Sequence, residues 1–335
     1  MVLLPMLKQN QVGRKMGSHP NRFLLVVLLL LLQVSIPTNA QPQEEEEELE
    51  KVVIDLFEKV ATTDVTIREK YAAKAEEELV SMGGKVVPIL LEHYLMTDSA
   101  RERHSLNRVV SKIGEPALEH LHRVMWEGDP EKVRRISYIL GRIASPRSTH
   151  ILLEYVDKPG YEEARSSIVY ALGRIGSKEA VPKLIALIND QDVFLRKNVV
   201  VALGRIGDPR AVQSLVQSLG DKYHIVRYPA SEALTKIGEP AVPKLLEELE
   251  KSSGKKKYHI IETLGKIGSL EAVPSLAKVL DDKDWAARAF AAEALAELGA
   301  KQVLGKLWVL AKTDEHPYVR QAATQAIQKI EETDS

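Results

Sequence analysis

Arginine, lysine and tyrosine recur between residues 108 and 205 at places that repeat about every 31 residues. Such a row could bind an anionic polypeptide, because guanidinium and ammonium groups pair with carboxylates and tyrosine offers a flat ring and a hydroxyl. The candidate binding residues are Arg108, Lys112, Arg134, Tyr138, Arg142, Tyr170, Arg174, Lys197 and Arg205. Whether they form one site depends on the elements that carry them.

The chain is built from a repeat whose clearest mark is Ala-Leu-Gly-Arg-Ile-Gly, found at residues 171–176 and again at 202–207. The last glycine, or the residue aligned with it, stands at positions 83, 114, 144, 176, 207, 238, 268, 299 and 331. A period this constant indicates a repeat protein, and a phosphate-binding loop would occur only once.

Each repeat contains two amphipathic segments joined by an acidic turn. In the second segment the residues 8, 5, 4 and 1 positions before the glycine are almost all apolar, which predicts a helix with a buried stripe. The terminal glycine suits a left-handed helix end, and an inner glycine such as Gly204 suits close helix approach. We therefore predict an all-α fold, an α-α superhelix of about eight to nine helical hairpins over residues 51–335.

The candidate binding residues lie 10, 6 and 2 positions before the glycine, on the stripe opposite the apolar one. The second helices of such arrays usually line the concave surface, so this stripe is expected to form the floor of a groove. Its charge changes along the chain: after Arg205 the position 6 before the glycine becomes Glu232, Glu262 and Glu293. A requirement for helix capping alone would not produce that change.

A second set of cations stands 11 positions before the glycine: Arg103, Arg165, Arg196, Arg227, Arg288 and Arg320, with Lys257 in the one irregular repeat, where Ser-Ser-Gly and three lysines at 252–257 replace the acidic turn. This set could be a row that binds anions. The alternative is a structural ladder, in which each arginine pairs with carboxylates of the acidic turn and ties adjacent repeats together. We favour the ladder.

The pattern Glu-Ala-Val-Pro-x-Leu at 179–184, followed by the acidic turn and Ala-Leu-Gly-Arg-Ile-Gly, resembles the short HEAT repeat named after phycobilisome lyases. The resemblance to this PBS-lyase HEAT-like repeat covers residues from about 50 to 331. It implies a HEAT-like solenoid. It leaves the function open, because the family ranges over scaffolds, chromophore lyases and iron hydroxylases.

The enzymatic members imply residues that this chain lacks. Deoxyhypusine-hydroxylase-like proteins hold two irons with paired His-Glu dipeptides, whereas only the reverse order occurs here, at 92–93, 119–120 and 315–316. No Gly-x-Ser-x-Gly nucleophile elbow is present, and the chain has no cysteine. We predict no catalytic residue, no metal site and no cofactor. An oxidoreductase of the deoxyhypusine-hydroxylase type or a lyase of the phycobilin type is the enzymatic alternative.

The first forty residues have the order of a secretory signal. Basic residues up to Arg22 precede an apolar run, and Thr38-Asn39-Ala40 place small residues before a cut at Gln41. Removing this segment, which has four basic residues and no acid, changes the formal net charge from −1 to −5. We predict a signal peptide at 1–40, an acidic disordered spacer at 41–50 and the repeat array at 51–335.

These observations predict an exported, non-catalytic scaffold or adaptor, periplasmic or secreted, that binds a partner protein or an acidic peptide in the groove. Nucleic acid is not expected as a partner because the mature chain is acidic and the basic stripe is narrow. Contact with a membrane is expected only if the N-terminal segment stays uncleaved, with residues 23–37 as the anchor of a tethered adaptor.

Overall fold

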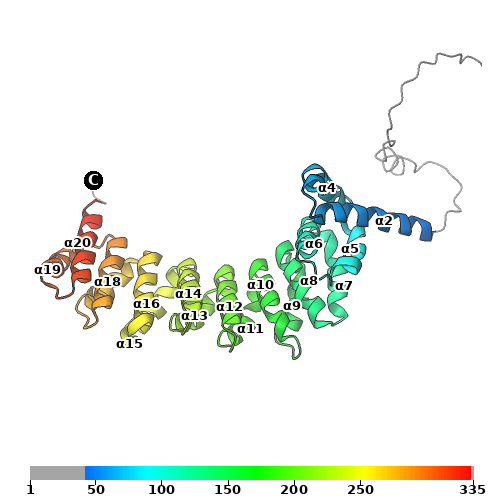
Figure 1. Ribbon diagram of the computed structural model, residues 1–335. Coiled ribbons are helices and arrows are strands. Elements are labelled where there is room, and N and C mark those ends of the chain that lie inside the picture. The colour runs from blue at the N-terminus through cyan, green and yellow to red at the C-terminus, as the bar shows by residue number, and fades with distance from the viewer. Residues whose placement is uncertain (1–41, 333–335) are drawn as a thin grey trace, which may run out of the picture. The chain divides into compact units, whose positions relative to one another are not determined.

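The computed structural model describes residues 42–332, and the predicted signal peptide at 1–40 lies outside them. The chain divides into two units, Met1–Leu49 and Glu50–Ser335, and the second contains the repeats. Within residues 42–332 every regular element is helical (Figure 1). This agrees with the predicted all-α superhelix of stacked hairpins.

Residues 42–50 differ from the prediction. The acidic segment expected to be a disordered spacer belongs to helix α2 (Pro42–Ala61), so that prediction is wrong from residue 42 onward. Glutamate favours helix formation, and Glu44 and Glu45 in the first turn interact favourably with the positive end of the helix dipole. Further along α2, Phe57 is fully buried and its ring centroid lies 4.1 Å from that of Tyr94.

The repeats are pairs of helices, and a short 3-10 turn usually precedes the first helix of a pair. The remaining α-helices are α3 (Val65–Ile67), α4 (Ala73–Ser81), α5 (Val87–Tyr94), α6 (Ala100–Ile113), α7 (Leu118–Trp126), α8 (Pro130–Ile143), α9 (Thr149–Tyr155), α10 (Arg165–Ile175), α11 (Val181–Ala186), α12 (Val193–Ile206), α13 (Val212–Ser218), α14 (His224–Ile237), α15 (Val242–Lys251), α16 (Gly254–Ile267), α17 (Val273–Val279), α18 (Trp285–Glu297), α19 (Leu304–Thr313) and α20 (Pro317–Glu332). From α6 onward the even-numbered helices are the second helices of the repeats.

The acidic turns begin the second helices. Asp192 accepts a hydrogen bond from the backbone N–H of Phe194 at the start of α12, and Asp284 accepts one from Ala286 at the start of α18. These carboxylates satisfy N–H groups that have no partner inside the helix.

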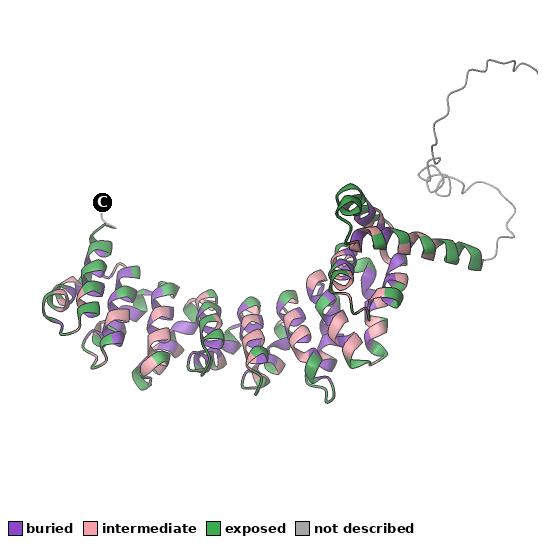
Figure 2. Ribbon diagram, viewed as in Figure 1, coloured by how far each residue is buried: buried purple, intermediate pink, exposed green. Residues whose placement is uncertain are grey.

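The apolar stripe of the second helices forms the core. Val199, Ala202 and Leu203 of α12 are at most 1% exposed, whereas Ile206 at the end of the stripe is half-buried. Figure 2 shows buried residues where helices face one another and exposed residues on the outer turns. Successive second helices pack directly on each other, α8 on α10, α10 on α12 and α12 on α14.

Glycine makes that close packing feasible. A Cβ atom at Gly204 would lie 2.6 Å from the Cβ of Ala233 in the next second helix, too close for any side chain. Gly207 ends α12 with a φ of 68°, in the left-handed region. Ala144 holds the same position at the end of α8 with a φ of 56°, where its side chain creates strain.

Candidate binding site on the second helices

The nine predicted binding residues all lie on second helices, α6, α8, α10 and α12, in the register expected from the sequence. We call the surface formed by the positions 10, 6 and 2 before each repeat glycine the second-helix face. Some of the charged residues among these nine form ion pairs with carboxylates of the protein, and the others, together with the two tyrosines, do not.

Three cations near the start of the array are neutralised within the fold. Arg108 Nε lies 2.8 Å and Lys112 Nζ lies 2.6 Å from the two carboxylate oxygens of Glu76, a residue of α4 that is only 7% exposed. Arg134 donates two hydrogen bonds of 2.6 Å to Glu131, and these bonds lower the pKa of Glu131 to about 2. These cations therefore stabilise the fold and are poorly suited to capture a ligand.

The middle of the face carries a pair of stacked tyrosines. The ring centroids of Tyr138 and Tyr170 lie 5.4 Å apart with an interplanar angle of 18°. The guanidinium carbon of Arg205 lies 5.7 Å from the Tyr170 ring centroid. Three adjacent second helices thus contribute to one surface that combines aromatic rings with a cation.

The cations around this tyrosine pair have no carboxylate partner. Within residues 42–332, none of Arg142, Arg174, Lys197 and Arg205 forms an ion pair, and Arg174 and Arg205 are exposed. We call these four cations and the two tyrosines the central basic patch: Tyr138, Arg142, Tyr170, Arg174, Lys197 and Arg205. Positive charge without a partner on a folded surface is available to an anionic ligand.

Beyond α14 the cations of the face are paired again. Lys266 Nζ lies 3.2 Å from Glu232 and 3.0 Å from Glu262, and Lys329 forms an ion pair with Glu297. The change of charge seen in the sequence therefore corresponds to a change from unpaired cations to cations held by neighbouring carboxylates.

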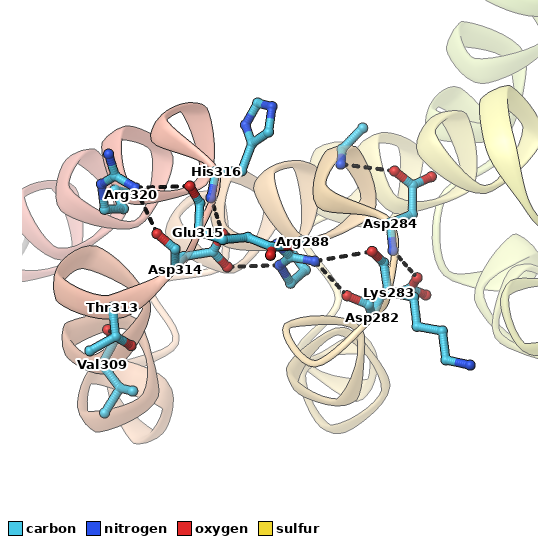
Figure 3. Close-up of polar contacts among 11 residues, drawn as sticks. Asp282, Lys283, Asp284, Arg288, Val309, Thr313, Asp314, Glu315, His316 and Arg320 are labelled. Carbon is cyan, nitrogen blue, oxygen red and sulfur yellow. Dashed lines mark hydrogen bonds and ion pairs between the residues drawn. The ribbon is translucent and has the colours of Figure 1, made fainter.

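The arginines 11 positions before the glycine form the structural ladder. Arg288 donates from Nη1 to the carbonyl oxygens of Asp282 and Lys283 in its own turn. Its Nε and Nη2 donate to the carboxylate of Asp314 in the next turn, at 2.8 and 2.9 Å (Figure 3).

Other repeats use the same arrangement. Arg196 bonds the carbonyls of Asp190 and Gln191 and the carboxylate of Asp221, and Lys257 pairs with Asp282. Arg103, Arg227 and Arg320 bond the carbonyls of their own turn but form no ion pair with a carboxylate within residues 42–332. The Nε of Arg227 instead faces the ring nitrogen of His259 at 3.3 Å.

Sequence reasoning missed a hollow of about 310 Å³ between α18 and α20 on the same face. Trp285, Phe290 and Tyr318 line it, with Glu293 among the lining residues. One signal could have revealed it: aromatic residues open the last two second helices, beside alanines where earlier repeats carry large side chains.

The histidines do not gather as metal ligands would. Among residues 42–332, no group of three histidine, aspartate or glutamate side chains is placed to hold a metal ion. His122 is half-buried and bonds Ser148 Oγ at 2.9 Å, and burial together with Arg147 lowers its pKa.

Among residues 42–332 no helix is long and apolar enough to cross a membrane.

Stacked helical pairs with a continuous core define an α-solenoid repeat protein, a class whose function depends on the surface that the stacked helices present. The family model for HEAT repeats matches residues 160–235 and 242–328. These two segments are therefore HEAT repeats.

Other comparisons concern the fold only. A search of curated proteins finds no match to the sequence. Among solved structures, human deoxyhypusine hydroxylase in complex with glycerol is 22% identical, with 78% of this chain and 98% of that chain covered and a TM-score of 0.32. YibA from E. coli is 19% identical, with 77% and 96% covered and a TM-score of 0.45.

The complex of CpcE and CpcF of phycocyanin lyase from a Nostoc species is 18% identical, with 63% and 94% covered and a TM-score of 0.36. Since these TM-scores are all below 0.5, the activities of the three proteins carry no argument about this chain.

Proposed function

We propose that this chain is a non-catalytic scaffold whose central basic patch captures an acidic segment of a partner protein. One observation carries the proposal: four cations on neighbouring second helices lack a carboxylate partner. Before them, Arg108, Lys112 and Arg134 are held by Glu76 or Glu131, and after α14, Lys266 and Lys329 are held by Glu232, Glu262 or Glu297. Lys236 of α14, between these groups, bonds the carbonyl oxygen of Arg205. A face that was merely solvated would not require this contrast.

The stacked tyrosines support the proposal. Tyr138 and Tyr170 provide rigid contact area at the centre of the patch, and their hydroxyls can donate to carboxylates or to peptide carbonyls. An extended acidic segment lying across α8, α10 and α12 would meet Arg142, Arg174 and Arg205 in turn.

The test is a charge reversal. We expect the triple variant Arg142→Glu, Arg174→Glu, Arg205→Glu to weaken binding of a labelled glutamate-rich peptide at least about tenfold while its melting temperature stays within a few degrees of the wild type. A matched control reverses three exposed lysines on the other side of the repeats, Lys85, Lys178 and Lys278. This control changes the net charge by the same amount and should bind within about twofold of wild type.

Three results would contradict the proposal. Equal loss in both triple variants would mean that only net charge matters. Loss of stability in the patch variant would make the arginines structural. Tighter binding of an oligothymidylate of equal charge through the same residues would replace a protein partner with single-stranded nucleic acid, since bases also stack on tyrosine.

We also propose that residues 1–40 direct export and are removed. The N-terminus of protein recovered from outside the cytoplasm tests this: Gln41, or its cyclised form, is expected at the first position. Retention of residues 23–37 would favour the tethered adaptor. Stoichiometric iron or another metal in the purified protein would contradict the non-catalytic assignment and favour the hydroxylase-like alternative.

A further inference from the structure

The hollow between α18 and α20 has aromatic walls that are open to solvent. Trp285 is 43% exposed and Tyr318 is 64% exposed, and their ring centroids lie 5.9 Å apart at an angle of 27°. His316 stacks on Trp285 at 3.8 Å and 6°, which fixes the orientation of the indole. Exposed large rings held in one orientation by stacking present ready-made faces to a ligand.

Small residues create the space between these rings. Ala289 occupies the position 10 before the repeat glycine, where the two preceding second helices carry Tyr228 and Tyr258. Ala286 and Ala322 also border the hollow. Phe290 closes one side and stacks on Tyr258, with ring centroids 5.4 Å apart.

The only acidic group lining this hollow has no counter-charge. Glu293 lines the hollow, is exposed, and forms no ion pair or hydrogen bond with any of residues 42–332. Partial burial and the neighbouring carboxylates Glu262 and Glu297 raise its pKa. Those two neighbours are themselves paired, Glu262 with Lys266 and Glu297 with Lys329.

We propose that this hollow binds the guanidinium group of an arginine side chain in a partner polypeptide. The planar cation stacks on the Trp285 and Tyr318 faces, and its N–H groups donate to Glu293. Gln321 and Gln325 on the α20 side supply amide oxygens for the remaining donors. A lysine ammonium would gain the charge contact but not the stacking.

The position of the hollow favours a polypeptide as the source of the cation. Ala289, Glu293, Gln321 and Gln325 line it from positions of the second-helix face, so an extended chain lying on α18 and α20 can insert one side chain and continue beyond it. Its charge preference is opposite to that of the central basic patch. The inference therefore does not rest on the proposed function, and the two sites fail or succeed separately.

The experiment uses Trp285 as the reporter. Replacing the exposed Trp126 and Trp308 with phenylalanine leaves Trp285 as the only tryptophan. The probe is a capped peptide with one arginine among glycine, serine and alanine, titrated against its twin in which citrulline replaces arginine. Citrulline has nearly the same shape without the charge. We expect saturable change in Trp285 fluorescence with the arginine peptide and at least about tenfold weaker binding of the citrulline peptide.

Variants locate the effect at the carboxylate. Glu293→Gln should weaken the arginine peptide at least about fivefold, and Glu271→Gln, the same change on an exposed residue away from the hollow, should stay within about twofold. Glu293→Gln should not lower the melting temperature, because an unpaired carboxylate does not stabilise the fold.

Four outcomes would overturn the inference: equal binding of the citrulline peptide, equal effects of the two variants, no saturable signal at millimolar peptide, or N-acetylarginine amide binding as tightly as the peptide. The last outcome would assign the hollow to a small-molecule cation instead of a polypeptide.

Discussion

Replacing Asp314 with alanine removes the acceptor of the last rung of the arginine ladder. The wild-type carboxylate accepts two hydrogen bonds from Arg288 and a third, of 2.8 Å, from the backbone N–H of His316. Both side chains of the pair are buried, 9% exposed for Arg288 and 4% for Asp314. Burial alone would raise the pKa of Asp314, but the bonds from Arg288 and the His316 N–H, together with the charge of Arg288, outweigh it and lower the pKa.

The expected loss of stability follows from what the substitution leaves behind. Breaking one side of a buried ion pair costs about 3–5 kcal/mol, because the remaining charge stays desolvated. Two contacts reduce that cost here. Arg288 keeps its bonds to the carbonyls of Asp282 and Lys283, and the exposed Glu315, 3.7 Å from Nη2, can move closer. We therefore expect a loss of about 3 kcal/mol, at the lower end of that range.

The effect should be local, because in a solenoid each repeat contacts only its neighbours. Hydrogen exchange should show lost protection in α19 and α20 and little change in α10 and α12. Glu315→Ala is the control and should cost less than about 1 kcal/mol, as an exposed pair does. A loss below about 1 kcal/mol for Asp314→Ala, or equal deprotection along the array, would refute the idea that the ladder couples adjacent repeats.

Three further predictions follow from the packing and charge of single residues. Gly204→Ala should lower the free energy of unfolding, measured in urea, by about 1–3 kcal/mol, because its Cβ would collide with Ala233. Gly305→Ala in α19, where a Cβ would have nothing within 4 Å, should be neutral or stabilising. Equal effects of the two substitutions would contradict the close packing at Gly204. Ala144→Gly should stabilise by about 0.5–1 kcal/mol by relieving the left-handed strain, and a loss of stability would contradict that reading. Glu293→Gln should raise stability at pH 7, because the pKa of Glu293 in the folded protein lies above its unfolded value of about 4.5 and ionisation therefore opposes folding. The stability gain over wild type should shrink as the pH falls through the folded pKa and should stop changing below about 4.5. A gain that persists in full at low pH would assign the effect to packing.

Most of the fold could be predicted from the sequence because the same pattern of apolar residues, acidic turns and helix-ending glycines recurs along the chain. A residue such as Gly207 is ambiguous by itself, but a glycine at a period of about 31 after an apolar stripe indicates a helix end. The acidic segment before the array lacks this support, because residues 42–50 have no counterpart in the repeats. A run of glutamates is compatible with a solvated spacer and also with a helix, since glutamate has a high helix propensity, and the structure shows the helix.

The candidate site was predicted only in outline. Sequence register placed Arg108, Arg134 and Arg174 on one face but did not show that Arg108 is paired with a residue of another helix while Arg174 forms no ion pair within residues 42–332. Glu76 lies 32 residues before Arg108, and its distance from the guanidinium follows from how α4 packs on α6. Pairing across helices therefore decides which cations remain available, and periodicity does not contain that information.

The ladder arginines and the cations of the second-helix face have different roles. This difference explains how one solenoid can carry both the central basic patch and the hollow around Glu293. The ladder arginines bond to carbonyls and carboxylates of the turns, so part of the coupling between adjacent repeats lies outside the second-helix face. Exposed face positions such as Arg174 and Glu293 form no ion pair within residues 42–332. The face can therefore change from unpaired cations at α10 to an unpaired carboxylate at α18 while the turns keep the repeats connected. A partner with an acidic segment and an arginine farther along its chain would engage both surfaces at once, and its affinity would exceed that of either segment alone if its linker spans α12 to α18.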